Sequence, residues 1–527
     1  MLFIFVSLLV ITEAVRFHDL LPNGAIDFHG IPVEKYVHSM NRLIEVTHKL
    51  MEKDTEPLPH FEDIEWDQNS TQPDENPFLY QGDIALTEEQ LNALIEDFEI
   101  QLATKEGRPV PERLYSTDVG LWQRFPISWS IDYQRPPDGG IQAIRRGIAL
   151  WEQSTCLSFK ESTDYSNGGM IFFSGSGCFA PIGKTSLNYI SIGSRCGSPS
   201  VIAHEIGHSL GLFHTQTRPD ASTFVQIFWQ NIQSGLQYNY QPPQASFHAT
   251  TRGIPYDLGS LMHYGRTGFP IRAGLITMQP YSKNYYQSMG QRATVAFTDA
   301  KEVNTMYCNN LCPNKLQCLH GGYTDPKDCS KCRCPEGLGG KLCDTVAKSP
   351  TACGPGELNA SGEYQNLTMN GIHKCTYRIT APEGKKVALI LDWSAFDGGN
   401  FDAACDFNYV ELKYTSELQT VGAKFCNYYR TPLVEIPGAQ SQNQVYVIYE
   451  AWQEKYGFFL KYRYEPQGPT VQPLELTTAM SPEQPSTTEE PTTEDQRENE
   501  IDDDYTMLKK RKSIKRIRPL NFALNDV

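Results

Sequence analysis

Residues 204–214 read His-Glu-Ile-Gly-His-Ser-Leu-Gly-Leu-Phe-His, and this stretch determines the fold and the chemistry expected around it. On a helix, His204 and His208 lie four positions apart and project from one face, so both imidazoles can bind one metal ion. Gly211 can adopt the positive φ that ends the helix and brings His214 back to the same point. The stretch therefore predicts a tetrahedral zinc site with three histidine ligands and one open position.

Glu205 follows the first of these histidines directly. From there its carboxylate can reach a water on the metal and act as a general base. The alternative is a buried helix that carries these residues by chance, and the shorter pattern H-E-x-x-H alone is compatible with it. The chain has only 12 histidines in 527 residues, so the full eleven-residue pattern favours the metal site.

A second motif lies downstream, where residues 260–264 read Ser-Leu-Met-His-Tyr. Alone, Met262 would be interpreted as core packing and Tyr264 as a half-buried aromatic. After a long zinc motif, the same residues are typical of the Met-turn of metzincins. Met262 is then expected to form an apolar floor beneath the zinc ligands.

The two motifs together resemble the astacin family of zinc endopeptidases, in its nematode astacin-like form. The resemblance spans residues 116–308 and implies an α+β metzincin catalytic domain, a mixed sheet plus an active-site helix, with one Zn²⁺. It implies that Glu205 is catalytic and that Tyr264 is a displaceable fifth ligand which stabilises the oxyanion. The implied zinc ligands are His204, His208 and His214, and the implied disulfides are Cys156–Cys308 and Cys178–Cys196.

One residue departs from the family pattern. The family usually has a glutamate directly after the third histidine, where it helps to receive the mature amino terminus, whereas this chain has Thr215. Because the zinc ligands are intact, catalysis is expected to be retained. The way in which the new amino terminus is buried is left open.

Residues 15–115 have the features of a propeptide. They contain no cysteine, and two stretches, 36–51 and 91–102, carry apolar residues at helical spacing. Gly82-Asp83 between them would ordinarily be a turn. In astacins an aspartate after glycine blocks the zinc, and Asp83 matches it; a carboxylate on the metal leaves no activated water. The expected processing point of this zymogen is Arg113.

Composition indicates an extracellular protein. The net charge of −16 argues against nucleic acid as a partner. Residues 1–14 are expected to be a signal peptide, because their apolar run is too short to span a bilayer, and no integral membrane anchor is expected. The 14 cysteines suit an oxidising compartment. The glycosylation sequons are Asn69, Asn359 and Asn366.

Residues 309–344 hold six closely spaced cysteines and too few apolar residues for a core, so disulfides must stabilise them. Zinc binding is the alternative, but secretion favours disulfides. The spacing resembles an EGF-like module, without the acidic residues of the calcium-binding form. The implied disulfides are Cys312–Cys329, Cys318–Cys332 and Cys334–Cys343.

Residues 353–464 combine alternating strands with four cysteines and resemble a CUB domain, an all-β sandwich. The implied disulfides are Cys353–Cys375 and Cys405–Cys426. Asp392 and Asp406 match two of the calcium ligands of CUB domains, but the third acidic position is lost near Trp452. Solvated carboxylates are the favoured interpretation, and calcium binding is left open.

Residues 465–527 are rich in Pro, Thr and Glu and end in a basic cluster, so we expect a disordered tail. The cluster could bind acidic matrix polymers or remain solvated.

These features predict a secreted zinc endopeptidase, made as a zymogen, that hydrolyses extracellular proteins. Matrix or cuticle collagen precursors are among the substrates that the resemblance suggests. The EGF-like and CUB modules are expected to contact substrate or matrix proteins. The alternative is a catalytically inactive binding or adhesion protein that uses these modules, and a purely structural zinc site is a third interpretation.

Overall fold

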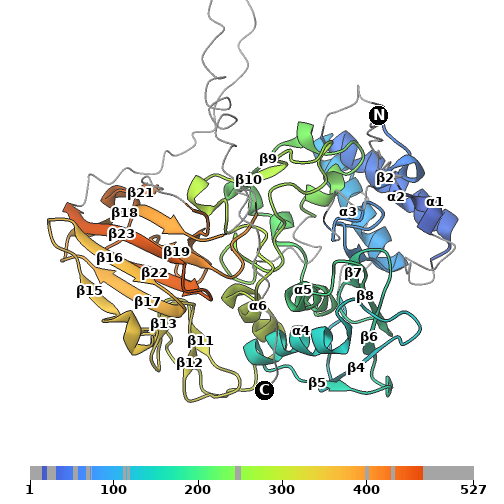
Figure 1. Ribbon diagram of the computed structural model, residues 1–527. Helices are drawn as coiled ribbons and strands as arrows, with labels where there is room; N and C mark the ends of the chain where they lie inside the picture. Colours follow the sequence, from blue (N-terminus) through green and yellow to red (C-terminus); the bar gives the residue numbers. More distant parts are fainter. Residues whose placement is uncertain are drawn as a thin grey trace, which may run out of the picture. The chain divides into compact units, whose positions relative to one another are not determined.

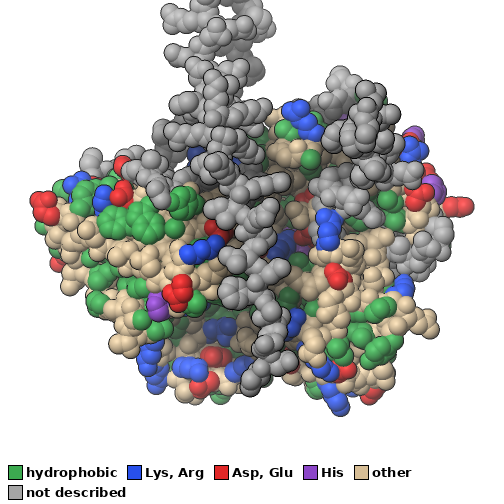
Figure 2. All heavy atoms as spheres, in the orientation of Figure 1, with side chains coloured by type: hydrophobic (Ala, Val, Ile, Leu, Met, Phe, Trp, Pro, Cys, Tyr) green, Lys and Arg blue, Asp and Glu red, His purple; other side chains and the backbone are tan. Residues whose placement is uncertain are grey.

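The computed structural model describes residues 15–466 except 21–30, 52–56, 67–71, 73, 111–113, 115–118, 244–250, 398–402 and 429–433. The expected signal peptide, Asn69, Arg113 and nearly all of the expected tail lie outside the described residues. Within them, no helix is both long and apolar enough to cross a membrane. On the face shown in Figure 2, acidic and basic side chains of the described residues are interspersed.

Strands between residues 84 and 192 form a mixed six-stranded sheet, in the order β3-β7-β8-β6-β4-β5. Its strands are β3 (Ile84–Ala85), β4 (Ile127–Ile131), β5 (Phe159–Glu161), β6 (Gly169–Phe173), β7 (Cys178–Pro181) and β8 (Asn188–Ile192). Only β7 and β8 pair antiparallel. This sheet confirms the mixed α+β architecture expected of the catalytic region.

Two helices pack together next to this sheet, α4 (Gly140–Ser154) and α5 (Pro199–Ser209) (Figure 1). The indole of Trp151 in α4 is fully buried, and its Nε1 donates a hydrogen bond to Ala203 O of α5 at 2.7 Å. Ile202 and Phe172 belong to the same hydrophobic core. Helix α5, which carries the first two histidines, is thus held against α4 by packing and by one buried hydrogen bond.

The expected propeptide contributes helices α1 (Phe17–Leu20), α2 (Val33–Leu50) and α3 (Glu88–Lys105) and strands β1 (Val15–Arg16) and β2 (Glu65–Trp66). The hydroxyl of Thr87 accepts from Gln90 N, and the Gln90 side chain accepts from Thr87 N, a capping box that begins α3. Met40 and Phe98 share a hydrophobic core with Phe179 of β7. The segment before residue 115 is therefore built into the catalytic fold.

Shorter elements complete this part of the chain. They are β9 (Val225–Ile227), β10 (Met278–Pro280), which pairs with β9, and α6 (Phe297–Tyr307). Residues 309–346 form two small hairpins, β11 (Tyr323–Thr324) with β12 (Cys332–Arg333) and β13 (Leu338–Gly339) with β14 (Thr345–Val346).

The last described region is a sandwich of a five-stranded and a four-stranded sheet, in the orders β15-β17-β22-β19-β20 and β16-β23-β18-β21. The strands are β15 (Glu357–Asn359), β16 (Gln365–Asn370), β17 (His373–Thr380), β18 (Lys385–Ala395), β19 (Tyr409–Lys413), β20 (Ala423–Phe425), β21 (Val434–Ile436), β22 (Gln444–Ala451) and β23 (Gly457–Pro466). All neighbours are antiparallel except β15 and β17. The two sheets share one hydrophobic core, as expected of an all-β sandwich.

No cysteine is free, and the disulfides have the pairing that the resemblances implied. They are Cys156–Cys308, Cys178–Cys196, Cys312–Cys329, Cys318–Cys332, Cys334–Cys343, Cys353–Cys375 and Cys405–Cys426.

Trp151→Phe should lower the stability of the protein by about 1–2 kcal/mol, because it removes the hydrogen bond to α5 and part of the buried ring. The thermal unfolding midpoint of the purified protein measures this loss. Trp129→Phe, in the same core but on β4, controls for the lost ring volume. An equal fall in both variants would show that the contact of Trp151 with Ala203 contributes nothing.

Candidate metal centre

Helix α5 places the first two histidines. Ser198 accepts a hydrogen bond from Val201 N at 3.2 Å, and Pro199 occupies the first turn, so the helix begins with a favourable cap. Past its end, Gly211 has φ +100°, the left-handed conformation predicted for it. The chain then returns and brings the side chain of His214 beside those of the helix.

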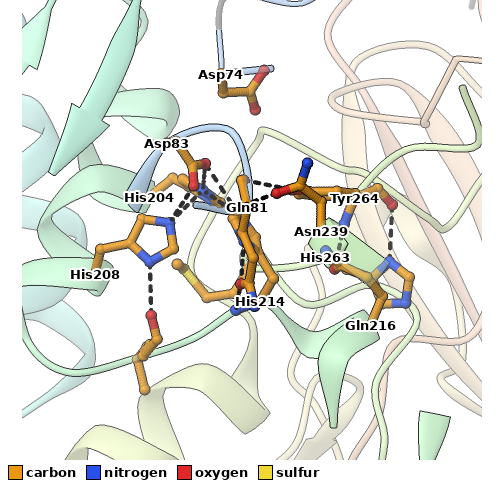
Figure 3. A network of polar contacts seen from close by, with 12 residues as sticks. Asp74, Gln81, Asp83, His204, His208, His214, Gln216, Asn239, His263 and Tyr264 are labelled. Carbon is orange, nitrogen blue, oxygen red and sulfur yellow. Dashed lines mark hydrogen bonds and ion pairs between the residues drawn. The ribbon is translucent and has the colours of Figure 1, made fainter. Parts of the chain in front are cut away.

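The three imidazoles converge on one point through their Nε2 atoms (Figure 3). Nε2 of His204 lies 3.1 Å from Nε2 of His208 and 3.3 Å from Nε2 of His214. Nitrogens that bind zinc tetrahedrally at about 2.0–2.1 Å lie about 3.3 Å apart. The separations fit a single zinc ion between the rings.

The other ring nitrogens fix the protonation of each histidine. Nδ1 of His204 faces Leu261 O at 2.8 Å, Nδ1 of His208 faces Leu212 O at 2.7 Å, and Nδ1 of His214 faces Gln81 Oε1 at 2.9 Å. Since oxygens of this kind only accept, each Nδ1 carries a hydrogen, and a neutral ring then offers its Nε2 lone pair to a metal ion. Burial, reinforced by Arg292, lowers the pKa of His204 to about 3. Such an arrangement of inward lone pairs is the donor set of a metal ion.

Asp83 joins this cluster from the expected propeptide. Its Oδ2 lies 3.1 Å from Nε2 of both His204 and His214, and its Oδ1 lies 3.3 Å from Nε2 of His208. Burial opposes ionisation, but the neighbouring imidazoles offset it, and the pKa of Asp83 lies well below its usual value. A carboxylate oxygen thus faces the same point as the three nitrogens.

Gly82 makes this approach possible. It has φ +79°, and a Cβ there would lie 2.7 Å from Asp74 O and 2.8 Å from the ring of Phe269. Only glycine fits both conditions. Asp83 O then accepts from Ala180 N at 2.9 Å, and β3 continues parallel to β7.

Glu205 is completely buried, and neither of its carboxylate oxygens has a hydrogen-bond partner among the described residues. Burial raises its pKa well above the usual value, and the charge of Asp83 adds to this shift. Once ionised, an unpartnered carboxylate beside the first metal ligand can accept a proton from a nucleophile.

The Met-turn lies beneath α5. The sulfur of Met262 would meet a Cβ at Gly207 at 2.8 Å, so it packs directly against the helix, as expected for an apolar floor. The ring of Tyr264 lies 4.6 Å from that of His214. In this structure its hydroxyl donates a hydrogen bond to Gln81 O of the expected propeptide.

Several residues at the centre were not predicted to act there. Gln81 and Asn239 form part of the network in Figure 3, and Arg292 donates to Leu261 O and His263 O at 3.1 Å each. Arg292 also pairs with Asp74 at 2.9 Å. Their contacts span long sequence separations, so no local pattern indicates them.

The remaining candidates lie elsewhere. Asn359 and Asn366 are exposed on β15 and β16. Asp392 pairs with Lys461 at 3.0 Å, and Asp406 accepts from Arg292 N at 2.8 Å. Among the described residues, neither belongs to a cluster of three metal-ligating side chains.

Thr215, at the position where the family has glutamate, begins a chain of hydrogen bonds. Its hydroxyl donates to Ser260 Oγ at 2.9 Å, which donates to Asp299 Oδ1 at 2.6 Å. Asp299 also accepts from Leu261 N of the Met-turn at 2.8 Å. A neutral hydroxyl thus links the third histidine to a buried carboxyl group.

Asp299 should make stability depend on pH. Burial raises its pKa to about 7, against about 3.9 in an unfolded chain. Between these values the folded chain binds the extra proton, so the stability that this group contributes falls as pH rises. Asp299→Asn cannot ionise, and the difference in unfolding midpoint, variant minus wild type, should rise by about 5 °C from pH 5 to pH 7. A constant difference would contradict the raised pKa.

Comparisons with known proteins agree with this geometry. Residues 115–308 match the model of the Astacin peptidase family. The chain is similar to three zinc metalloproteinases of Caenorhabditis elegans: nas-34 (35% identity, 76% of this chain, 66% of that protein), nas-30 (35%, 67% and 46%) and nas-26 (37%, 65% and 82%). It thus spans less than two thirds of the length of nas-34 and nas-30.

Among solved structures, the chain is similar to high choriolytic enzyme 1, a hatching enzyme zinc-protease from the medaka fish Oryzias latipes. The identity is 27% and the TM-score 0.33, over 37% of this chain and 98% of that one.

Proposed function

Because the chain belongs to the astacin family, we propose that it is a zinc-dependent endopeptidase. The observation that carries this proposal is the convergence of three Nε2 lone pairs beside the unpartnered carboxyl group of Glu205. His204, His208 and His214 would bind the zinc. Three protein nitrogens leave a position for water or substrate, as in catalytic rather than structural zinc sites.

The side chains divide the work of peptide hydrolysis. Bound zinc lowers the pKa of water and polarises a carbonyl group. Glu205 takes the proton of the attacking water and delivers it to the leaving amine. The hydroxyl of Tyr264, once released from Gln81 O, donates a hydrogen bond to the carbonyl oxygen as negative charge develops there. Met262 supports α5 from below.

The chain is proposed to be a zymogen. Asp83 lies at the position that a nucleophile would need, so the segment before residue 115 must leave before substrate can enter. The aspartate is the inhibitory ligand and belongs to this latent state only.

The surrounding modules support an extracellular role. We propose a signal peptide at 1–14, a propeptide at 15–115, a catalytic domain at 116–308, an EGF-like module at 309–344, a CUB domain at 353–464 and a tail beyond 465. Their disulfides are suited to secretion. The substrates are extracellular proteins, and the EGF-like and CUB modules contact substrate or matrix.

A catalytically inactive adhesion protein is the second candidate. It would need no general base, and the retention of Glu205 beside three intact ligands favours the enzyme.

Glu205→Gln should retain zinc but lower peptidase activity about 10²–10⁴-fold, because the amide cannot accept the proton. The activity is measured on a quenched fluorescent peptide after removal of the propeptide, and the zinc by elemental analysis. Glu161→Gln, an exposed residue of β5, is the matched control and should remain fully active. A chelator should inactivate wild type and control alike. Near wild-type activity of Glu205→Gln would disprove the mechanism.

A further inference from the structure

We propose that His214 and Thr217 form a binding site for a primary carboxamide beside the metal centre, and that Gln81 of the propeptide occupies it to keep the enzyme latent. The carboxamide site consists of His214 and Thr217, and Asn239 and Tyr264 bind the backbone of the same residue. This inference rests on the proposed peptidase function and adds a second inhibitory residue to Asp83.

Gln81 is completely buried and uses both its side chain and its backbone (Figure 3). Its Oε1 accepts from Nδ1 of His214 at 2.9 Å, and its Nε2 donates to Thr217 Oγ1 at 3.2 Å. Its backbone N donates to Asn239 Oδ1 at 2.7 Å, and its carbonyl accepts from the hydroxyl of Tyr264. Four groups of the enzyme therefore hold one residue of the propeptide.

The direction of these hydrogen bonds selects an amide. Thr217 Oγ1 donates its own hydrogen to His214 O at 2.9 Å, so towards Gln81 it can only accept. Nδ1 of His214 faces the other side of the ligand as a donor. A group that accepts at one atom and donates at the other fits this pair. A glutamate would place a second acceptor against Thr217 and a second carboxylate near Asp83.

The backbone shows that these contacts hold Gln81 in place. Its φ is +50°, a left-handed conformation that glutamine rarely adopts, and Gly82 follows with φ +79°. Such a conformation persists only where surrounding contacts stabilise it. The side chain of Asn239 is oriented for this purpose, because its Nδ2 donates to Leu236 O at 3.1 Å and leaves Oδ1 to accept.

Through these contacts Gln81 acts on two groups of the catalytic centre, the imidazole of His214 and the hydroxyl of Tyr264. Asp83 faces the Nε2 side of His214, whereas Gln81 faces its Nδ1 side. Gln81 also engages the hydroxyl that the proposed mechanism assigns to the oxyanion. Departure of the propeptide therefore frees the metal position, the outer face of the third ligand and Tyr264 together.

The test uses full-length zymogens that differ only within the propeptide, so that the processed enzyme is the same chain in every case. Gln81→Ala and Gln81→Glu are compared with wild type and with Gln101→Ala. Gln101 also contacts the catalytic region, through Pro242 O at 3.4 Å, but lies on α3 away from the metal centre. The measurement is the activity of each uncleaved zymogen, divided by its activity after limited trypsin digestion.

Wild type and Gln101→Ala should stay latent, whereas both Gln81 variants should gain uncleaved activity about tenfold or more, because each loses buried hydrogen bonds. Latency of the Gln81 variants equal to that of Gln101→Ala would overturn the carboxamide site. Gln81→Glu has nearly the shape of wild type and decides the question if Gln81→Ala is not secreted. If processed wild type shows no chelator-sensitive activity, the proposed function fails instead.

Discussion

Three buried Nδ1–H···O=C hydrogen bonds are the constraint on which the rest of the centre depends. They hold the three Nε2 lone pairs inward, where no solvent can satisfy them. A cation at their centre would satisfy all three lone pairs at once. Three separate parts of the fold supply the acceptor oxygens. Leu212 O lies in the turn after Gly211, Leu261 O in the Met-turn and Gln81 Oε1 in the expected propeptide.

Two of these acceptors are permanent and one is not. Leu212 and Leu261 belong to the catalytic region, whereas Gln81 lies before the expected processing point. In the proposed zymogen, latency would therefore depend on the orientation of a metal ligand as well as on the carboxylate of Asp83. The two ring nitrogens of His214 make this double contact possible. Gln81 binds Nδ1, and Asp83 faces Nε2.

The sequence predicted the parts of the centre that local geometry controls. The four-residue spacing of His204 and His208 places them on one helical face, and Gly211 has the positive φ that the turn requires. Gln81, Asn239 and Arg292 could not be found in this way. Gln81 and Asn239 are separated by 158 residues, and their contact depends on how α2 and α3 pack against the catalytic core. No period or short motif encodes such an approach.

Arg292 connects the expected propeptide to a second metal ligand, His204, through Leu261 O. Leu261 O accepts from Nδ1 of His204 at 2.8 Å and also from Nη1 of Arg292 at 3.1 Å, so both lone pairs of one carbonyl are used. Arg292 is in turn paired with Asp74 of the propeptide. A displacement of Arg292 would turn that carbonyl, and with it the imidazole of His204. Besides the direct contacts of Asp83, the expected propeptide contacts the ligand set at His214 through Gln81 and indirectly at His204 through Asp74. Both contacts lie within ten residues of Asp83, so one short segment of the proposed propeptide acts on two of the three ligands and also places a carboxylate at the centre.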